Sequence, residues 1–224
     1  MENMYEKFHL NTNNYPSQSI FKKGESYIYK ITPEQKSLRT ISLNNFFEDN
    51  YEVKRGTSRI FDSNVPLKKI SLILNRSYLF DKFNKNIVPS AGGFYPIDIY
   101  VYFKNNDVLE EGFYYYNPID FQLEVINITT LRDEKIFWGN NIFAYNAPVI
   151  IFFVANISYS YKKYGDKAYR FALIESGHIC QKVIDNALEL GVKYCPIGGY
   201  WEERIEQLLN TSDKQHLLYL LALG

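Results

Sequence analysis

This sequence of 224 residues has few of the residues that mark several specialised protein classes. It contains two cysteines, two tryptophans and two methionines, and its 25 basic and 25 acidic residues cancel to a net charge of zero. Because Cys180 and Cys195 form no CxxC motif, the sequence predicts neither a disulfide scaffold nor a cysteine-rich zinc site. We expect both cysteines to be small core residues.

Long apolar segments and an excess of positive charge are also missing. The first residues are polar and lack the apolar stretch of a signal peptide, and no run reaches the roughly 18 apolar residues of a membrane span. The balanced charge gives no electrostatic footprint for a nucleic-acid partner. We therefore expect a cytoplasmic protein that binds neither nucleic acid nor a membrane.

Aromatic residues are abundant instead, with 20 tyrosines and 16 phenylalanines. The hydrophobic share of 46% and the charged share of 22% are ordinary for a globular domain, so a core can form without disulfides. Such rings can offer flat surfaces to a planar ligand, whereas a compositional bias towards Tyr, Phe, Asn, Ile and Lys is the alternative explanation for the tyrosine excess.

Hydrophobic periodicity predicts an α+β protein, with helices around a central mixed, mostly antiparallel sheet. Helices are expected over 67–74, 166–190 and 202–209, and strands over 97–104, 112–118, 121–127, 148–157 and 217–223. The second and third strands read as a hairpin, and the fourth as the central strand. The terminal apolar strand must be paired, with a second subunit as one candidate partner.

The first part of the chain differs from the rest. Residues 1–45 are polar and aromatic with only short candidate elements, and we interpret them as an N-terminal extension. We expect residues 46–224 to form one domain.

Two arginines four residues apart, Arg55 and Arg59, enclose Gly56, Thr57 and Ser58. If these residues form a first helical turn, both guanidinium groups lie on one face, and the helix amides add positive potential. Such a pair suits a phosphate group, because guanidinium matches phosphate oxygens with two hydrogen bonds. The alternative is a surface turn with two solvated arginines.

Two further motifs are weak by themselves. The small residues at 89–93 (PSAGG) allow backbone amides to approach a ligand, although an ordinary turn would look the same. The adjacent Lys163 and Tyr164 supply one candidate proton acceptor and one donor just before the long helix. An exposed surface pair is the alternative.

The long helix contains two unusual residues. Gly177 destabilises a helix by about 1 kcal/mol relative to alanine. A closely packed neighbour that leaves no room for a side chain would explain why glycine is present there. We expect His178 to be an interior histidine, and because no further ligands follow at metal-binding spacing, no metal site is predicted.

The order of these motifs resembles the nitroreductase-fold flavoenzymes and, within them, the SagB-type dehydrogenases, which oxidise azoline rings in thiazole- and oxazole-containing peptides. The matching run is R-x-T-x-R-x-F, then PSAGG-x-YP, then KYG-x-x-AYR-x-x-x-x-E-x-GH-x-x-Q, then IGG and an aromatic residue. It covers about 51–224, and the stretch Phe8–Thr12 fits an aromatic-His-x-x-Thr segment near the family's start.

The resemblance implies a nitroreductase-like fold, an FMN cofactor and an intertwined homodimer with FMN at the subunit interface. By this resemblance, the FMN phosphate and ribityl chain are held by Arg55, Gly56, Thr57 and Arg59. The loop that reaches the flavin from the partner subunit consists of Pro89, Ser90, Ala91 and Gly92. Contacts near the flavin ring come from Gln181, Ile197, Gly198 and Gly199, and the catalytic pair is Lys163 and Tyr164. Gly56 departs from the family, where a second arginine is frequent.

Three functions follow in order of preference. The first is an FMN-dependent azoline oxidase that acts on a peptide, passes hydride to FMN and is reoxidised by oxygen; a heterocyclase complex is a candidate partner. The second is a generic NAD(P)H-dependent FMN nitro- or quinone reductase. The third is a non-catalytic subunit of a peptide-modifying complex, against which the intact Lys163–Tyr164 pair and both arginines argue.

Overall fold

The computed structural model describes residues 4–12, 56–62, 64–104 and 106–224. Arg55 and most of the expected extension therefore lie outside the described residues. The described N-terminal helix belongs to the same compact unit as Thr57–Gly224. The division of the chain at residue 45 stays a prediction.

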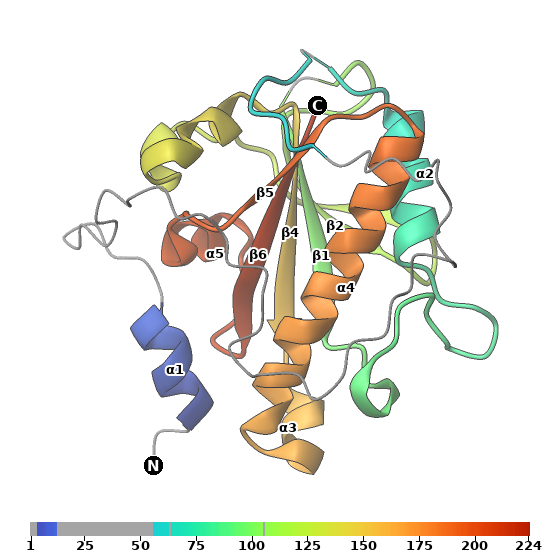
Figure 1. Cartoon of the computed structure of the whole chain (residues 1–224), viewed down its shortest axis with the longest axis vertical. Coiled ribbons are helices and arrows are strands. Elements are labelled where there is room, and N and C mark those ends of the chain that lie inside the picture. Colours follow the sequence, from blue (N-terminus) through green and yellow to red (C-terminus); the bar gives the residue numbers. More distant parts are fainter. Residues whose placement is uncertain (1–3, 13–55, 63, 105) are drawn as a thin grey trace, which may run out of the picture. The chain divides into compact units, whose positions relative to one another are not determined.

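Six strands form one sheet in the order β3-β2-β1-β4-β6-β5 (Figure 1). They are β1 (Ile97–Phe103), β2 (Gly112–Asn117), β3 (Gln122–Asn127), β4 (Val149–Asn156), β5 (Tyr194–Ile197) and β6 (Gln215–Leu223). Every pairing among them is antiparallel, including the expected β2–β3 hairpin. The apolar β4 is central, as expected, with β1 on one side and β6 on the other.

The terminal strand β6 is paired on both sides inside the chain. Leu220 lies opposite Phe152 of β4 and Ile197 of β5. A second subunit is therefore not needed to cover its polar backbone groups. The short edge strand β5 was not expected, because four residues that include Pro196 give almost no alternating pattern.

Helices form other parts of the described chain. They are α1 (Met4–Thr12), α2 (Leu67–Ser77), α3 (Ser158–Tyr164), α4 (Lys167–Glu189) and α5 (Glu202–Leu208), with 3₁₀ turns η2 (Ala91–Gly93), η3 (Glu134–Ile136) and η4 (Gly139–Asn146). The long helix α4 ends, as expected, before Gly191, which has a φ of 63°. Helix α3 was missed, because its polar and aromatic residues have no apolar period.

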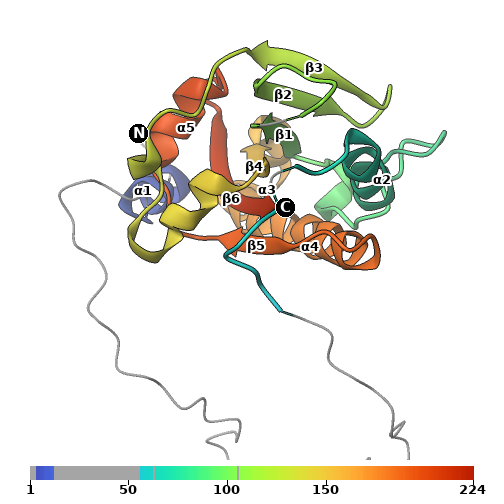
Figure 2. The ribbon, with the colours of Figure 1, turned by 90° about the horizontal axis from the view of Figure 1, so that it is seen from above.

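Both faces of the sheet are covered, as Figures 1 and 2 show. On β4, Ile151 and Phe153 belong to the core beneath α2 and α4, whereas Ile150 and Phe152 belong to the core with η4 and α5. Because both faces of β4 are buried, its sequence is a continuous apolar run and does not alternate between apolar and polar residues. Cys180 and Cys195 are both buried, as expected.

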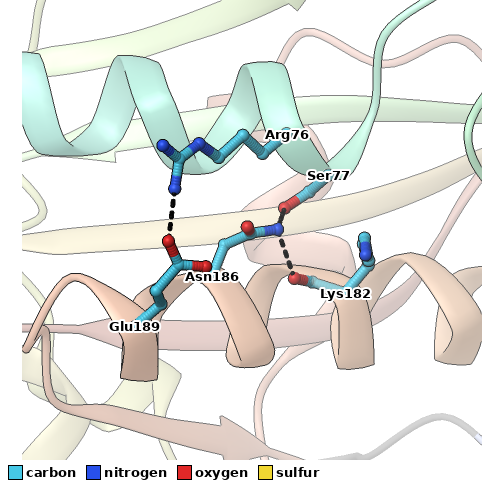
Figure 3. Close-up of polar contacts among 5 residues, drawn as sticks. All are labelled: Arg76, Ser77, Lys182, Asn186 and Glu189. Carbon is cyan, nitrogen blue, oxygen red and sulfur yellow. Dashed lines mark hydrogen bonds and ion pairs between the residues drawn. The ribbon is translucent and has the colours of Figure 1, made fainter.

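Helices α2 and α4 are joined by polar contacts as well as by apolar packing (Figure 3). The Asn186 side-chain amide donates to the Ser77 hydroxyl at 2.9 Å and to the Lys182 carbonyl at 2.8 Å. At the surface, Arg76 pairs with Glu189 at 2.8 Å. The buried amide contributes more to stability than the exposed ion pair, because solvent screens exposed charges.

Two further expectations concern the helices. His178 is exposed on α4, so the expected interior position is wrong; it lies next to the buried stripe of the helix and points away from it. None of the described helices is long and apolar enough to cross a bilayer.

Candidate active site

The predicted catalytic pair lies at the end of the sheet where β4 leads into α3. Lys163 and Tyr164 form the last turn of α3, which follows β4 after one residue. The turn at 91–93 lies at the same end, because the chain after it enters β1 at Ile97, opposite Ala155 of β4. The structure therefore brings two motifs together that are about 70 residues apart in the sequence.

The Tyr164 hydroxyl lies directly over the backbone of Gly92. A Cβ atom at Gly92 would stand 2.5 Å from the Tyr164 oxygen, and the glycine has a φ of 67°. Both facts require glycine at this position. The Phe94 ring contacts Tyr164 edge-on at 6.0 Å between centroids, and the Lys163 ammonium lies 5.7 Å from the Phe94 ring centroid.

The turn itself is held by Ser90. The Ser90 hydroxyl accepts the Tyr95 amide at 2.9 Å, and the Ser90 carbonyl accepts the Gly93 amide at 3.1 Å. Pro89 and Gly92 are exposed, so the turn presents backbone to the outside. A cavity of about 150 Å³ adjoins this turn and the start of α3.

A buried carboxylate that the sequence analysis did not assign, Glu175, lies behind this turn. Its side chain is 2% exposed, and neither carboxylate oxygen has a hydrogen-bond partner of good geometry in the described part of the chain. Burial raises the pKa of Glu175 to about 7, while the nearby Ser90 hydroxyl lowers it by a smaller amount. Its place on the apolar stripe, between Ala172 and Ile179, is the sequence signal that could have found it.

Arg59 lies at the opposite end of the sheet. The Ser58 amide donates to the Tyr194 carbonyl of β5 at 2.8 Å, which holds this segment against the edge strand. Arg59 is exposed, 5.7 Å from the Phe143 ring centroid, and it has no carboxylate partner among the described residues. Its positive charge lowers the pKa of Cys195 against the larger effect of burial.

The expected helical turn at the arginines is not present in its described part. Residues 56–60 are extended or bent, and the Ser58 hydroxyl accepts the Ile60 amide at 3.2 Å. This local side-chain hydrogen bond competes with helical bonding, so no helix amides add to the charge of Arg59. Gly56 and Thr57 are both exposed.

The remaining predicted residues lie between the two ends. Ile197 ends β5, and the Gly199 carbonyl accepts the Trp138 amide at 3.0 Å. Gly198 is exposed beside them. Gln181 lies on the exposed face of α4 and donates to Asp185 at 2.8 Å.

The two ends are far apart within one chain. Val149 of β4 lies opposite Leu223, next to Tyr194, whereas Asn156 at the other end of β4 precedes α3. Seven residue steps of about 3.3 Å give roughly 23 Å between them. Arg59 and the Lys163–Tyr164 pair therefore do not meet in a single chain.

Comparison with protein families identifies the chain. The model of the Nitroreductase family matches residues 53–224. A protein of Methanocaldococcus jannaschii, provisionally named a nitroreductase, is 30% identical over 186 residues, which are 79% of this chain and 89% of that protein. The chain therefore belongs to the nitroreductase family.

Solved structures share the fold at lower sequence identity. A chain of the Escherichia coli microcin synthetase McbBCD complex, solved with truncated pro-MccB17 bound, matches 98% of this chain and 90% of its own length with a TM-score of 0.76 and 16% identity. A nitroreductase-type protein of Ralstonia eutropha matches 86% of both chains, with a TM-score of 0.65 and 20% identity. An oxidoreductase containing FMN matches 83% of this chain and 82% of its own, with a TM-score of 0.52 and 18% identity.

Proposed function

We propose that this nitroreductase-family oxidoreductase binds FMN and oxidises azoline rings of a peptide to thiazoles or oxazoles, as the SagB-type dehydrogenases do. The observation that carries the proposal is the Lys163–Tyr164 pair beside the exposed backbone of Gly92. Azoline oxidation removes a ring proton, so it needs a proton-accepting group next to a surface that a peptide can approach. The fold match to a synthetase chain solved with a precursor bound supports the same function.

The residues at the arginine end suit the FMN phosphate. Arg59 offers an exposed guanidinium without a competing carboxylate among the described residues, and guanidinium binds phosphate through two parallel hydrogen bonds. We assign the same role to Arg55, with Gly56 and Thr57 beside the ribityl chain. Ile197, Gly198, Gly199 and Gln181 would face the flavin ring.

The separation of the two ends leads us to propose a homodimer with composite sites. About 23 Å is too far for one FMN to touch both ends of the same chain. A second copy would bring its turn at Pro89–Gly92 and its Lys163–Tyr164 pair to the arginine end of the first. The exposed face of α4 supports this assembly, because it carries Leu173 and Ile174 in the open.

When bound, FMN supplies the acceptor for the hydride that leaves the azoline ring. One member of the Lys163–Tyr164 pair removes the proton from the ring carbon next to the carbonyl, and the other orients the ring. The ring thus loses one hydride and one proton and becomes aromatic. The turn at Pro89–Gly92 would reach the flavin from the partner subunit, and a heterocyclase that forms the azoline would be the partner complex.

A NAD(P)H-driven nitro- or quinone reductase is the second candidate. The name of the Methanocaldococcus relative favours it. Such a reductase passes hydride from the nicotinamide through the flavin to the acceptor, and no substrate carbon loses a proton. The two functions therefore differ in whether they need Lys163 and Tyr164.

The first experiment compares Lys163→Ala and Tyr164→Phe with a control on the same helix, Lys162→Ala. Lys162 is exposed and does not line the cavity beside the turn. We expect azole formation, measured as the loss of two hydrogens per ring by mass spectrometry, to fall about 10²- to 10⁴-fold in the Lys163 and Tyr164 variants only. Unchanged azole formation in the Lys163–Tyr164 double variant would remove the pair from the mechanism.

The second experiment tests the composite site by mixing two inactive proteins. Arg59→Ala lacks one half of the site, and the Lys163–Tyr164 double variant lacks the other. Random exchange of subunits gives half heterodimers, each with one intact site, so about a quarter of the wild-type activity should return. If the subunits exchange and no activity returns, the composite site is contradicted. Separately, a wild-type protein that purifies without flavin would favour a non-catalytic subunit.

A further inference from the structure

Three candidate metal ligands from distant parts of the chain meet beside a cavity. They are His9 on α1, Glu206 on α5 and His216 on β6, and their ligand atoms all lie within 4.8 Å of one another. The cavity next to them has a volume of about 740 Å³. The cluster shares no residue with the candidate active site, although His216 lies at the same end of the sheet, opposite Ala155 of β4.

Two of the three side chains are held in place by hydrogen bonds. His9 Nδ1 is 2.7 Å from the Tyr169 hydroxyl. The Leu217 amide donates to one oxygen of Glu206 at 2.8 Å, and the second oxygen stays available. Metal-binding histidines usually have such a partner on the other ring nitrogen, which fixes the tautomer and the ring orientation.

The third ligand is positioned by ring packing. The His9 and His216 rings lie 4.5 Å apart between centroids, and the Tyr5 ring contacts His216 edge-on at 5.9 Å.

The charge of the cavity favours a cation. The described residues that line it include four carboxylates, Glu6, Glu203, Glu206 and Asp213, and no lysine or arginine. Two imidazoles and one carboxylate are a common ligand set for zinc, with the fourth position left to water. Ligands at about 2.1 Å from a tetrahedral ion are about 3.4 Å apart, so small side-chain rotations close the present spacing.

We propose that His9, Glu206 and His216 bind one Zn²⁺ ion, with a water molecule on the cavity side as the fourth ligand. The ion joins the N-terminal helix α1 to α5 and β6. The spacing of the three residues in the sequence, far from any contiguous zinc motif, explains why the sequence analysis predicted no metal site. This proposal does not depend on the proposed azoline chemistry.

The experiment uses the full-length protein, stripped of metal with a chelator and titrated with zinc sulfate by calorimetry. We expect one Zn²⁺ per chain and a binding constant at least about 100-fold weaker in His9→Gln, Glu206→Gln and His216→Gln. Tyr169→Phe should weaken binding about 10- to 100-fold, because it removes the hydroxyl that orients His9. His178→Gln is the matched control, since it removes the remaining histidine of the chain, which is exposed on α4, and it should bind zinc as the wild type does.

Two further measurements protect the test against misfolded variants. Co²⁺ in place of Zn²⁺ should give the strong visible absorption of a four-coordinate site in the wild type, and zinc should raise the melting temperature of the wild type and of His178→Gln only. A wild-type protein without a stoichiometric site, or an equal loss of binding in His178→Gln, would overturn the proposal. In that case the cluster is a packing arrangement of aromatic rings only. The flavin content of the same variants shows separately whether the active site is intact.

Discussion

The two ends of the central sheet differ in how complete they are within one chain. At the α3 end, Tyr164, Gly92 and Phe94 contact one another, and the buried Glu175 lies behind them. At the other end, Arg59 is exposed and is held mainly through the backbone of its neighbour Ser58. The first end is a preformed group of side chains, whereas the second is an open cationic edge that suits a ligand.

The helix between the two ends explains how they could act together. Helix α4 is buried along one stripe and open along the other, where Leu173, Ile174 and Leu188 are exposed. Gly177 lies on the open side, and no atom of the described residues would stand within 4 Å of an added Cβ. The expected close-packed neighbour of Gly177 is thus absent from the described part of the chain, which is consistent with a second copy there.

The largest difference between the ends should be seen in flavin binding. We expect Arg59→Ala to weaken FMN binding about 10- to 100-fold, because it removes one charge-assisted contact to phosphate. The measurement is the FMN dissociation constant of the refilled apoprotein. Arg76→Ala is the control, since it removes an exposed arginine that pairs with Glu189, and it should bind FMN normally. Equal affinity in Arg59→Ala and the wild type would refute the phosphate assignment.

The α3 end should be distinguished by its pH dependence. The pKa of Glu175 is raised from its ordinary value of 4.5 to about 7. The contribution of this carboxyl group to the free energy of unfolding is therefore fully present below pH 4.5, and it is lost as the pH rises through 7. Glu175→Gln should therefore be more stable than the wild type at pH 8, by up to about 3 kcal/mol, and equal to it near pH 4.5.

Chemical unfolding at both pH values measures this difference. Glu189→Gln is the control at the far end of α4, because Glu189 is exposed and pairs with Arg76 at the surface. It should shift stability by less than about 1 kcal/mol at either pH. A Glu175→Gln variant that is less stable than the wild type at pH 8 would show that the carboxylate is stabilised by contacts other than those described.

The smallest effect is expected midway between the ends, at Gly177. In a monomer, Gly177→Ala should stabilise α4 by up to about 1 kcal/mol, because the site has room for a methyl group and alanine favours helix. In a dimer that packs closely against this residue, the same change should weaken association. Sedimentation and thermal unfolding over a range of concentrations separate the two, and a stabilised, fully dimeric variant would place the interface elsewhere.

The sequence predicted the elements with strong local patterns. The apolar run at 148–157, the hairpin and the long helix before Gly191 all lie where expected, because their signals depend on neighbours along the chain. Helix α3 and strand β5 were missed, since one has no apolar period and the other is four residues long. His178 was misplaced because it adjoins the buried stripe of α4 without belonging to it.

The family, the motif order and most of the sheet could be inferred from the amino-acid sequence, because these depend on residue types and on spacing along the chain. The three-dimensional structure was needed to show that Tyr164 lies over Gly92, that Arg59 lies at the far end, and that Glu175 is buried without a hydrogen-bond partner among the described residues. The same holds for the meeting of His9 with His216. Such contacts join residues far apart in sequence, and their distances follow from strand order and helix packing, which no local pattern encodes.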